Sequence, residues 1–240
     1  MLFRSVVRKP LKTKNETQDD HIRNLVRSGR EHIMVSDLRA RLTPDQQALF
    51  AFPIQAFTYT AGNSKTVAQV MPKQNHTDLV TYLNNQSITG KQIKGILNDI
   101  ISSVKALRQH GYVSLDLKLD NFLVTADGHA KLTDHESLYP FGAELPYMYG
   151  TTGYMAPELV TLEATPSMDL YALAAIIEEI GSIFGCLDQV RSIAENLRSS
   201  RHESTKQVDS IINNLSKLLD QAIRNNATIA IDDKIGRAHV

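Results

Sequence analysis

The sequence predicts an α+β fold with a β-containing first third and an α-rich remainder. Three observations support this fold class. Two strand-like runs flank a turn signal between residues 50 and 71, amphipathic helical patterns cover 19–42 and 87–110, and the chain beyond residue 166 has a helical pattern. With 240 residues, 42% of them hydrophobic and 22% charged, the chain can bury the core of one domain or of two small lobes.

Composition argues against several functional classes. Basic and acidic residues both number 26, so the formal net charge is zero, and we expect no nucleic-acid partner. No apolar run reaches the ~18 residues that a membrane span needs, and MLFRSVVRKPLK has too short an apolar segment for a signal peptide. The single cysteine, Cys186, cannot form an internal disulfide, which fits a buried thiol in a reducing compartment. We therefore expect a cytoplasmic protein.

The elements of the first half follow from periodicity and turn signals. The run FRSVV within residues 1–12 predicts a short strand, and a polar link leads to a helix over about 19–42, with Gly29 inside its pattern. FAFPIQAFTYTAGNSKTVAQVM predicts two strands joined at AGNS. The pattern from Ser87 to His110 predicts a long amphipathic helix that Gly111 ends.

The second half begins with a hairpin and continues with helices. NFLVTADGHAKLTD reads as two short strands around the turn signal Asp127-Gly128. SMDLYALAAIIEEIGSIFG, residues 187–198 and VDSIINNLSKLLDQAIRNN have helical patterns. The last six residues, IGRAHV, are one translation of a common sequencing-adaptor read, so we interpret 235–240 as a scar outside the fold.

An unusual concentration of charge follows the helix that ends near Gly111. The stretch DLKLDN, residues 116–121, lies between apolar flanks, and alone it could be a solvated loop. Asp134 stands eighteen residues after Asp116 at the end of the apolar strand AKLTD, and GTTGYMAPE follows at 150–158. Their order and spacing together favour one functional site.

These residues resemble the catalytic loop, the metal-binding aspartate and the A-P-E element of the eukaryotic-type protein kinases. The resemblance covers roughly Val67 to Asp169, with Ser114-Leu115-Asp116 in place of H-R-D and Asp134-His135-Glu136 in place of D-F-G. It implies a two-lobed, divergent Ser/Thr kinase of a bacterial or effector-like type. We expect an abridged, β-containing N-lobe at 1–72 and a mainly α-helical C-lobe at 73–234.

The resemblance also implies ATP and Mg²⁺ as cofactors, since phosphoryl transfer depends on positioning and charge stabilisation around them. Asp116 would accept or orient the proton of the substrate hydroxyl, and Lys118 would neutralise charge on the transferring group. Asn121 and Asp134 would supply hard oxygen ligands to Mg²⁺. Thr151, seventeen residues after Asp134, stands where Ser/Thr kinases carry a threonine that bonds the catalytic aspartate and lysine.

Upstream positions are assigned by the same resemblance. Glu31 would pair with an ATP-anchoring lysine, for which Lys9 in VVRK is the choice and Lys12 and Lys14 remain competitors. Met71 would stand next to the adenine pocket, and Asp78 would reach the ribose hydroxyls. A solvated glutamate, a core methionine and a helix-capping aspartate are the alternatives for Glu31, Met71 and Asp78.

Two further side chains have expected structural roles. Glu158 would form a buried ion pair with a late arginine, for which Arg224 is the candidate. Asp169 would bond the backbone of the catalytic loop from the helix that follows.

The sequence also departs from the family pattern. No glycine precedes Gly29, so either the chain begins inside its gene, which we favour, or its first lobe is abridged. Leu115 replaces an arginine that receives a loop phosphate, which argues against control by loop phosphorylation. His135 and Glu136 replace the phenylalanine and glycine that follow the metal-binding aspartate.

Three functions remain open. The leading expectation is transfer to a protein substrate, in the cytoplasm or in a host cell after secretion. The alternatives are a pseudokinase or nucleotide-binding scaffold and, ranked lower, a small-molecule phosphotransferase. The sequence leaves the protein substrate and the oligomeric state open.

Overall fold

The computed structural model describes residues 5–8, 18–61, 64–72, 76–84, 88–184 and 187–200, and the isolated helical residues 210, 217 and 221. Cys186, Lys9, Lys12, Lys14, Arg224 and the segment 235–240 lie outside these residues. Within the described part, no helix combines the length and apolar character needed to cross a membrane.

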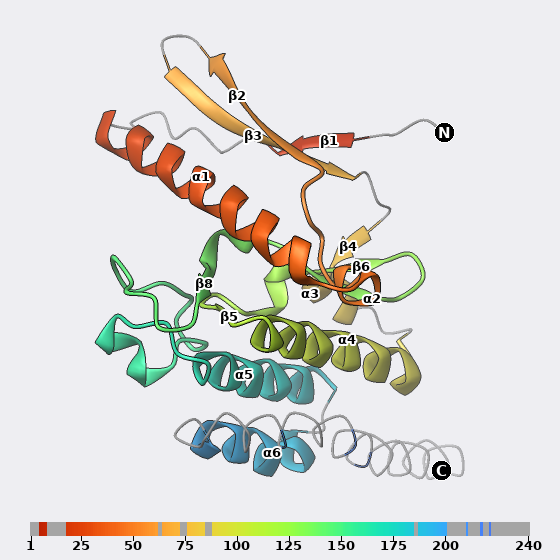
Figure 1. The fold of residues 1–240 in the computed structure, drawn as a ribbon. Coiled ribbons are helices and arrows are strands. Elements are labelled where there is room, and N and C mark those ends of the chain that lie inside the picture. Colours follow the sequence, from red (N-terminus) through yellow and green to blue (C-terminus); the bar gives the residue numbers. More distant parts are fainter. Residues whose placement is uncertain are drawn as a thin grey trace, which may run out of the picture.

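A three-stranded antiparallel sheet and one long helix form the upper part of the molecule in Figure 1. The strand order is β1-β3-β2, and Val6 of β1 lies opposite Met71 of β3. The helix α1 runs beneath the sheet and directs Val35 and Leu38 into the core. The bounds are β1 Ser5–Arg8, α1 Gln18–Arg41, β2 Gln55–Ala61 and β3 Ser64–Pro72.

A short helix, α2 (Pro44–Gln47), follows α1. Thr43 and Gln46 form a reciprocal capping box, and Pro44 occupies the first turn, where its missing amide costs nothing. The prediction of a strand starting near residue 50 is therefore wrong by several residues. Residues 50–54 instead cross to the lower part, where the Ala51 amide donates to the Leu132 carbonyl at 2.8 Å.

Two small antiparallel sheets lie between the upper sheet and the lower helices. One has the order β4-β6-β7, and the other pairs β5 with β8. The β6–β7 hairpin turns at the predicted Asp127-Gly128, where Gly128 has a φ of +85°. The bounds are β4 His76–Asp78, β5 Tyr112–Ser114, β6 Phe122–Thr125, β7 Ala130–Leu132 and β8 Leu138–Pro140.

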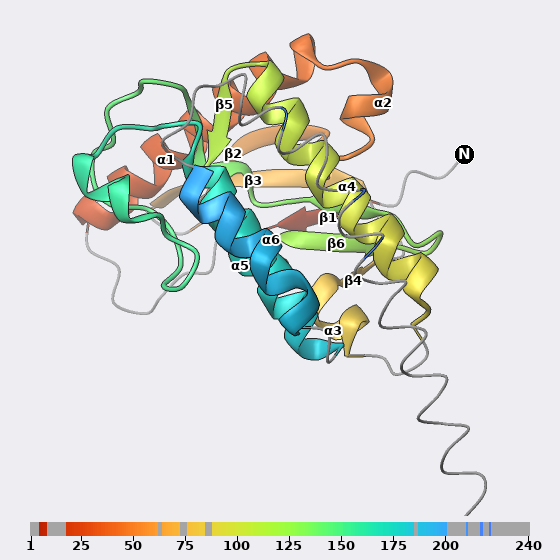
Figure 2. The same ribbon diagram turned by 90° about the horizontal axis from the view of Figure 1, so that it is seen from below.

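Helices make up the lower part, and Figure 2 shows α6 lying along α5 with α4 beside them. Thr89 caps α4, which ends before Gly111 at a φ of +78°, as the sequence predicts. The bounds are α3 Leu79–Leu83, α4 Gly90–Gln109, α5 Met168–Ile183 and α6 Leu187–Ser199. Three 3₁₀ turns complete the described elements: η1 Leu119–Asn121, η2 His135–Ser137 and η3 Pro157–Thr161.

The main apolar core joins the helices to the β6–β7 hairpin. The buried face of α4 repeats at helical spacing, through residues such as Ile93, Ile96, Ile100 and Leu107. Burying each such side chain stabilises the fold by about 1.5–3 kcal/mol. A second cluster, which includes Val113, Leu115, Tyr139, Tyr149 and Leu159, packs the segment after β8 against β5.

The two glutamates that interrupt the apolar run of α5 both have partners. Glu178 receives hydrogen bonds from Arg198 of α6 at 2.7 and 2.5 Å, and Glu179 accepts one from Tyr154. These half-buried pairs fix α6 and the GTTGYMAPE segment against α5.

Candidate active site

The charged stretch DLKLDN is held by alternating leucines. Leu115, Leu117 and Leu119 are buried, while the side chains of Asp116 and Lys118 remain about one-fifth exposed, at 21% and 20%. The backbone passes from β5 through a turn and η1 into β6. Because the apolar side chains anchor every second residue, the polar ones between them are held in place at the surface of the core.

Asp116, Lys118 and Thr151 form a closed triangle of polar contacts. The Thr151 hydroxyl donates to Asp116 Oδ1 at 2.6 Å, and Lys118 Nζ lies 3.0 Å from Asp116 Oδ2. Lys118 Nζ also donates to Thr151 Oγ1 at 2.7 Å. Thr151 comes from the segment after β8, so the triangle ties that distant segment to the DLKLDN stretch.

Asn121 joins this cluster through its amide nitrogen. The Asn121 Nδ2 donates to the Asp116 carbonyl at 2.7 Å and to Asp116 Oδ2 at 3.3 Å. Since the nitrogen is directed toward Asp116, the side-chain oxygen Oδ1 is the atom of Asn121 that could bind a metal.

Pairing of β6 with β7 brings Asp134 to the same end of the hairpin as Asn121. Phe122 lies opposite Leu132, and the Thr133 amide donates to the Asn121 carbonyl at 2.8 Å. Asp134 has a φ of 57° and a ψ of 71°, a left-handed conformation that costs most residues about 1–2 kcal/mol. Such strain is concentrated at functional sites, which fits a role for this carboxylate.

The donor set of Asn121 and Asp134 fits Mg²⁺. Mg²⁺ is usually bound by one or two protein oxygen ligands, with substrate phosphates and water completing its shell. Among the described residues, no group of three or more His, Cys, Asp or Glu side chains could hold a metal ion. A site built from one carboxylate and one amide therefore suits a metal that arrives with a nucleotide.

Asp169 of α5 supports the backbone that leads into the DLKLDN stretch. Its side chain is fully buried, and Oδ1 accepts a hydrogen bond from the Ser114 amide at 3.1 Å. The other oxygen, Oδ2, is buried without a hydrogen-bond partner in the described structure. Burial raises the pKa of this carboxyl to about 7, although the Arg108 guanidinium and the Ser114 amide act in the opposite direction. The structure thus contains the loop contact that was expected of Asp169.

The raised pKa gives a testable pH dependence. The native carboxyl binds its proton more tightly than the unfolded one, so the free energy of unfolding should fall as pH rises from 3.8 to about 7. Asp169→Asn keeps the acceptor for Ser114 and removes the titration. Relative to wild type, the variant should gain stability through this window, by an amount on the order of a few kcal/mol. Urea unfolding at several pH values measures the difference.

Asp188→Asn is the matched control, because that carboxylate lies at the start of α6 with its side chain 88% exposed. It should leave the pH profile unchanged. Parallel profiles for wild type and Asp169→Asn would contradict the assignment of the raised pKa to Asp169.

Of the two upstream residues expected to pair, Glu31 has contacts that the structure describes, whereas Lys9 lies outside the described residues. Glu31 of α1 is 5% exposed, and its Oε2 accepts a hydrogen bond from Gln69 Nε2 of β3 at 2.6 Å, so the solvated alternative is wrong. Gln69 pairs in register with Arg8, the last residue of β1. Lys9 follows Arg8 outside the described residues, and its pairing with Glu31 stays a prediction.

Asp78 has a local structural role, and Met71 lies in a strand of the upper sheet. Met71 lies half-buried in β3, and Asp78 caps α3, its Oδ1 accepting the Thr81 amide at 2.8 Å, which lowers the pKa of that carboxyl. The capping alternative for Asp78 is thus observed. Contacts of these two residues with a nucleotide stay predictions.

His135, which departs from the family pattern, and Glu158, which was expected to form an ion pair, both have contacts in the described structure. His135 is buried and packs against Phe52 and Phe50, with ring centroids 5.0 and 6.2 Å away. Glu158 Oε1 accepts a hydrogen bond from Ser167 at 3.1 Å, while its predicted partner Arg224 lies outside the described residues. Sequence reasoning missed Gln69, Arg108 and Arg30, whose partners are distant in sequence or are backbone atoms.

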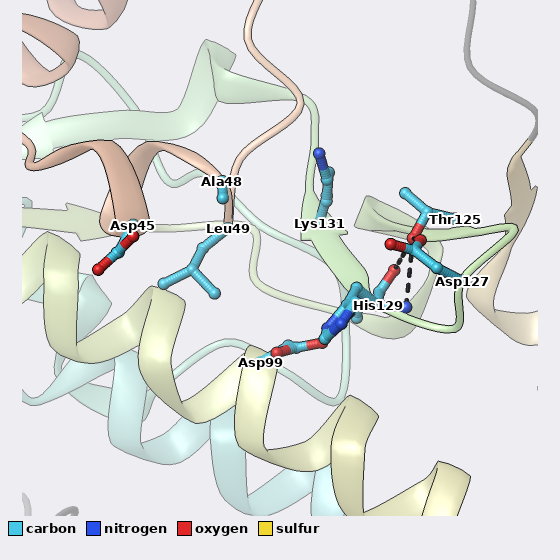
Figure 3. Close-up of a pocket in the computed structure, with 9 residues that line it drawn as sticks. Asp45, Ala48, Leu49, Asp99, Thr125, Asp127, His129 and Lys131 are labelled. Atoms are coloured by element: carbon cyan, nitrogen blue, oxygen red, sulfur yellow. Dashed lines mark hydrogen bonds and ion pairs between the residues drawn. The ribbon is translucent and has the colours of Figure 1, made fainter.

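A hollow of about 340 Å³ lies apart from these residues, between α2, α4 and the β6–β7 hairpin (Figure 3). Figure 3 shows Asp99 and His129 pointing toward each other, and Asp99 Oδ2 lies 3.0 Å from His129 Nδ1. Asp99 also accepts the Ala130 amide at 2.9 Å. None of the predicted site residues lines the hollow, so the candidate active site does not include it.

The chain is similar in sequence to known proteins. The family model described as a protein kinase domain matches residues 52–229. Serine/threonine-protein kinase SMU1 of Mycosarcoma maydis is 28% identical over 161 residues, covering 65% of this chain and 21% of that protein. Serine/threonine-protein kinase WNG1 of Toxoplasma gondii is 28% identical over 171 residues, covering 71% of this chain and 24% of that protein. The chain thus spans less than a quarter of the length of either relative.

A solved structure supports the fold. The kinase domain of a Toxoplasma gondii specific rhoptry antigen superposes with a TM-score of 0.66 at 17% identity, covering 94% of this chain and 76% of that one. The predicted two-lobed α+β fold is confirmed by this likeness, with the small sheet and α1 above and the helices below. Because the family model matches well over half of the sequence, the chain belongs to the protein kinase domain family.

Proposed function

We propose that this chain transfers the γ-phosphoryl group of ATP to Ser or Thr hydroxyls of a protein substrate, with Mg²⁺ as the metal. The observation that carries the proposal is the triangle of Asp116, Lys118 and Thr151, which joins a carboxylate, an ammonium and a hydroxyl at 2.6–3.0 Å. We assign residues 1–72 to the first lobe and 73–234 to the second.

Each side chain of the site has a distinct proposed role. Asp116 orients the acceptor hydroxyl and takes its proton, while Thr151 and Lys118 fix the carboxylate. Lys118 also offsets negative charge on the transferring group. Asn121 Oδ1 and Asp134 would hold Mg²⁺, which supplies charge neutralisation at the phosphates when bound.

The proposed nucleotide contacts come from the upper part and from the segment that leaves it. Glu31, buried against β3, is directed toward the strand that pairs with β1, and we propose that it pairs with Lys9 beside the phosphates. Met71 and Asp78 would border the adenine and ribose. A single cysteine in 240 residues favours a cytoplasmic location, with delivery into a host cell as the alternative.

A transfer assay with radiolabelled ATP and Mg²⁺ tests the proposal. The assay compares two peptide pools that differ only in carrying Ser/Thr or Tyr. We expect the Ser/Thr pool to be labelled in preference to the Tyr pool. Lys118→Met should lower the rate by about 10²–10³-fold, because it removes a donor to the developing charge. Lys91→Met, a change of the same kind on the exposed start of α4, should leave the rate unchanged.

Other outcomes favour the alternative functions. If wild type shows an ATP- and Mg²⁺-dependent rise in melting temperature but no transfer, the chain is a nucleotide-binding scaffold. If it labels an aminoglycoside or choline and no peptide, it is a small-molecule phosphotransferase. Either result would contradict the proposed protein-kinase activity.

A further inference from the structure

Arg30 of α1 reaches across to the segment that follows Asp134. Its Nη1 donates to the Leu138 carbonyl at 2.9 Å, and its Nη2 donates to the Glu136 carbonyl. Its guanidinium carbon lies 3.7 Å from the centre of the Tyr139 ring, a cation–π contact. One half-buried side chain therefore contacts three residues of η2 and β8.

Arg30 lies between two residues of the proposed site, Glu31 and Asp134. It directly precedes Glu31, whose carboxylate is turned to β3, while its own guanidinium is turned to the segment two to five residues beyond Asp134. A displacement of α1 relative to η2 would break these bonds. The placement of Glu31 and that of Asp134 are thus linked through one arginine.

The held segment also contacts the catalytic loop. β8 pairs with β5, so that Ser114 lies opposite Leu138, and the Leu115 amide donates to the Ser137 carbonyl at 3.1 Å. Asp116 is the next residue after Leu115. The contacts of Arg30 therefore continue through two short strands to the residue proposed as the base.

The acceptors of Arg30 are backbone carbonyls and an aromatic face. These contacts form without phosphorylation of the segment. A planar guanidinium has several donors and can hold two carbonyls at once. A lysine has a single ammonium and cannot reproduce this arrangement fully.

We propose that Arg30 is a positioning residue for phosphoryl transfer, which fixes the helix that carries Glu31 against the segment that carries Asp134. The inference rests on the proposed kinase function. Loss of Arg30 allows the two parts to shift relative to each other, and misplacement by about 1 Å can lower a catalytic rate about 10²-fold.

The test compares Arg30→Met and Arg30→Lys with Arg39→Met in the full chain. Arg39 lies on the same helix and is exposed, and its Nη1 lies 3.4 Å from the Pro53 carbonyl, so it controls for the loss of one positive charge. Arg30→Met should lower kcat by about 10–100-fold and raise the Mg²⁺ concentration needed for half-maximal rate. The KM for the peptide should stay within about twofold, and Arg30→Lys should fall between Arg30→Met and wild type.

Hydrogen exchange gives a readout that does not need turnover. Arg30→Met should speed exchange at the Leu115 amide and in β8, while α4 and α5 exchange as in wild type. If Arg30→Met unfolds, Tyr139→Leu takes its place, with a smaller expected change in the same measurements. This variant removes the ring under the guanidinium, which also packs against Tyr149.

The outcomes separate this inference from the proposed function. If wild type transfers phosphate and Arg30→Met matches Arg39→Met in kcat and in Mg²⁺ dependence, the positioning role is wrong and the kinase proposal stands. If wild type transfers nothing but its melting temperature rises with MgATP, the test of the positioning role is the Mg²⁺ concentration at the midpoint of that rise. The Arg30 variants should change this midpoint, and Arg39→Met should not; an unchanged midpoint in the Arg30 variants would contradict the positioning role. If wild type shows neither, the kinase proposal and the positioning role fail together.

Discussion

Asp116→Asn is expected to lower the rate of transfer to a Ser/Thr peptide by about 10²–10⁴-fold, the usual contribution of a positioned general base. Asparagine has nearly the same shape and can still accept the Thr151 hydroxyl that lies 2.6 Å from Asp116 Oδ1. It cannot take the proton of the acceptor, and it removes the charge that faces Lys118 at 3.0 Å. Initial rates with saturating MgATP measure the loss.

Binding should separate from turnover in this variant. Since Asp116 is not among the proposed metal ligands, the rise in melting temperature caused by MgATP should be close to that of wild type. A loss of binding equal to the loss of rate would show that Asp116 acts by holding the nucleotide, which would contradict its assignment as the base.

Asp120→Asn is the control for that experiment. Asp120 lies in the same loop, four residues from Asp116, but its side chain is exposed, and its neighbours Leu119 and Asn121 are buried. The substitution changes the same charge with the same atoms, and it should leave the rate within about twofold. A large loss in both variants would point to the overall charge of the loop as the cause.

Periodic patterns in the sequence predicted the long elements well. The helix expected at 19–42 is Gln18–Arg41, and the one expected from Ser87 to His110 is Gly90–Gln109. Both have apolar residues at helical spacing, and the second also has a cap at Thr89 and a glycine after its end. Local chemistry of this kind sets the boundaries of a helix with little help from the rest of the fold.

Short elements were missed for different reasons. The helix α2 has a local signal, because Thr43 and Gln46 form a capping box with Pro44 in the first turn, but the helix is only four residues long. The pairing of β5 with β8 had none. Each strand has three residues, and their register joins Val113 to Tyr139 across a long stretch of chain. Only tertiary packing specifies such a pair.

The candidate site was likewise predicted in part from the sequence. Asp116, Lys118, Asn121 and Thr151 were assigned through a resemblance of motifs and spacings, and the structure brings all four into one hydrogen-bonded cluster. The contacts of Arg30 could not be read from the sequence, because its acceptors are backbone carbonyls, which every residue has. The left-handed backbone of Asp134 was likewise invisible, since aspartate gives no local indication of it.

Asp134→Asn is expected to remove most of the Mg²⁺-dependent stabilisation by ATP and to lower the transfer rate by at least about 10²-fold, because a metal ligand contributes several kcal/mol of charge stabilisation. Asparagine tolerates the left-handed conformation at φ 57° at least as well as aspartate, so the substitution tests the charge without disturbing the backbone. Thermal melting at a fixed ATP concentration, with Mg²⁺ varied, measures the effect.

The control for this measurement comes from the opposite end of the same hairpin. Asp127→Asn changes an exposed carboxylate and keeps a turn sequence, Asn-Gly, that suits the hairpin as well as Asp-Gly does. It should preserve the Mg²⁺-dependent shift. Because Asp134 lies just beyond the strand that pairs with β6, a metal bound to Asp134 would lie at the same end of the hairpin as Asn121. If Asp134→Asn kept the shift and the rate of wild type, the metal would have to bind elsewhere, and the strained conformation of Asp134 would need another cause.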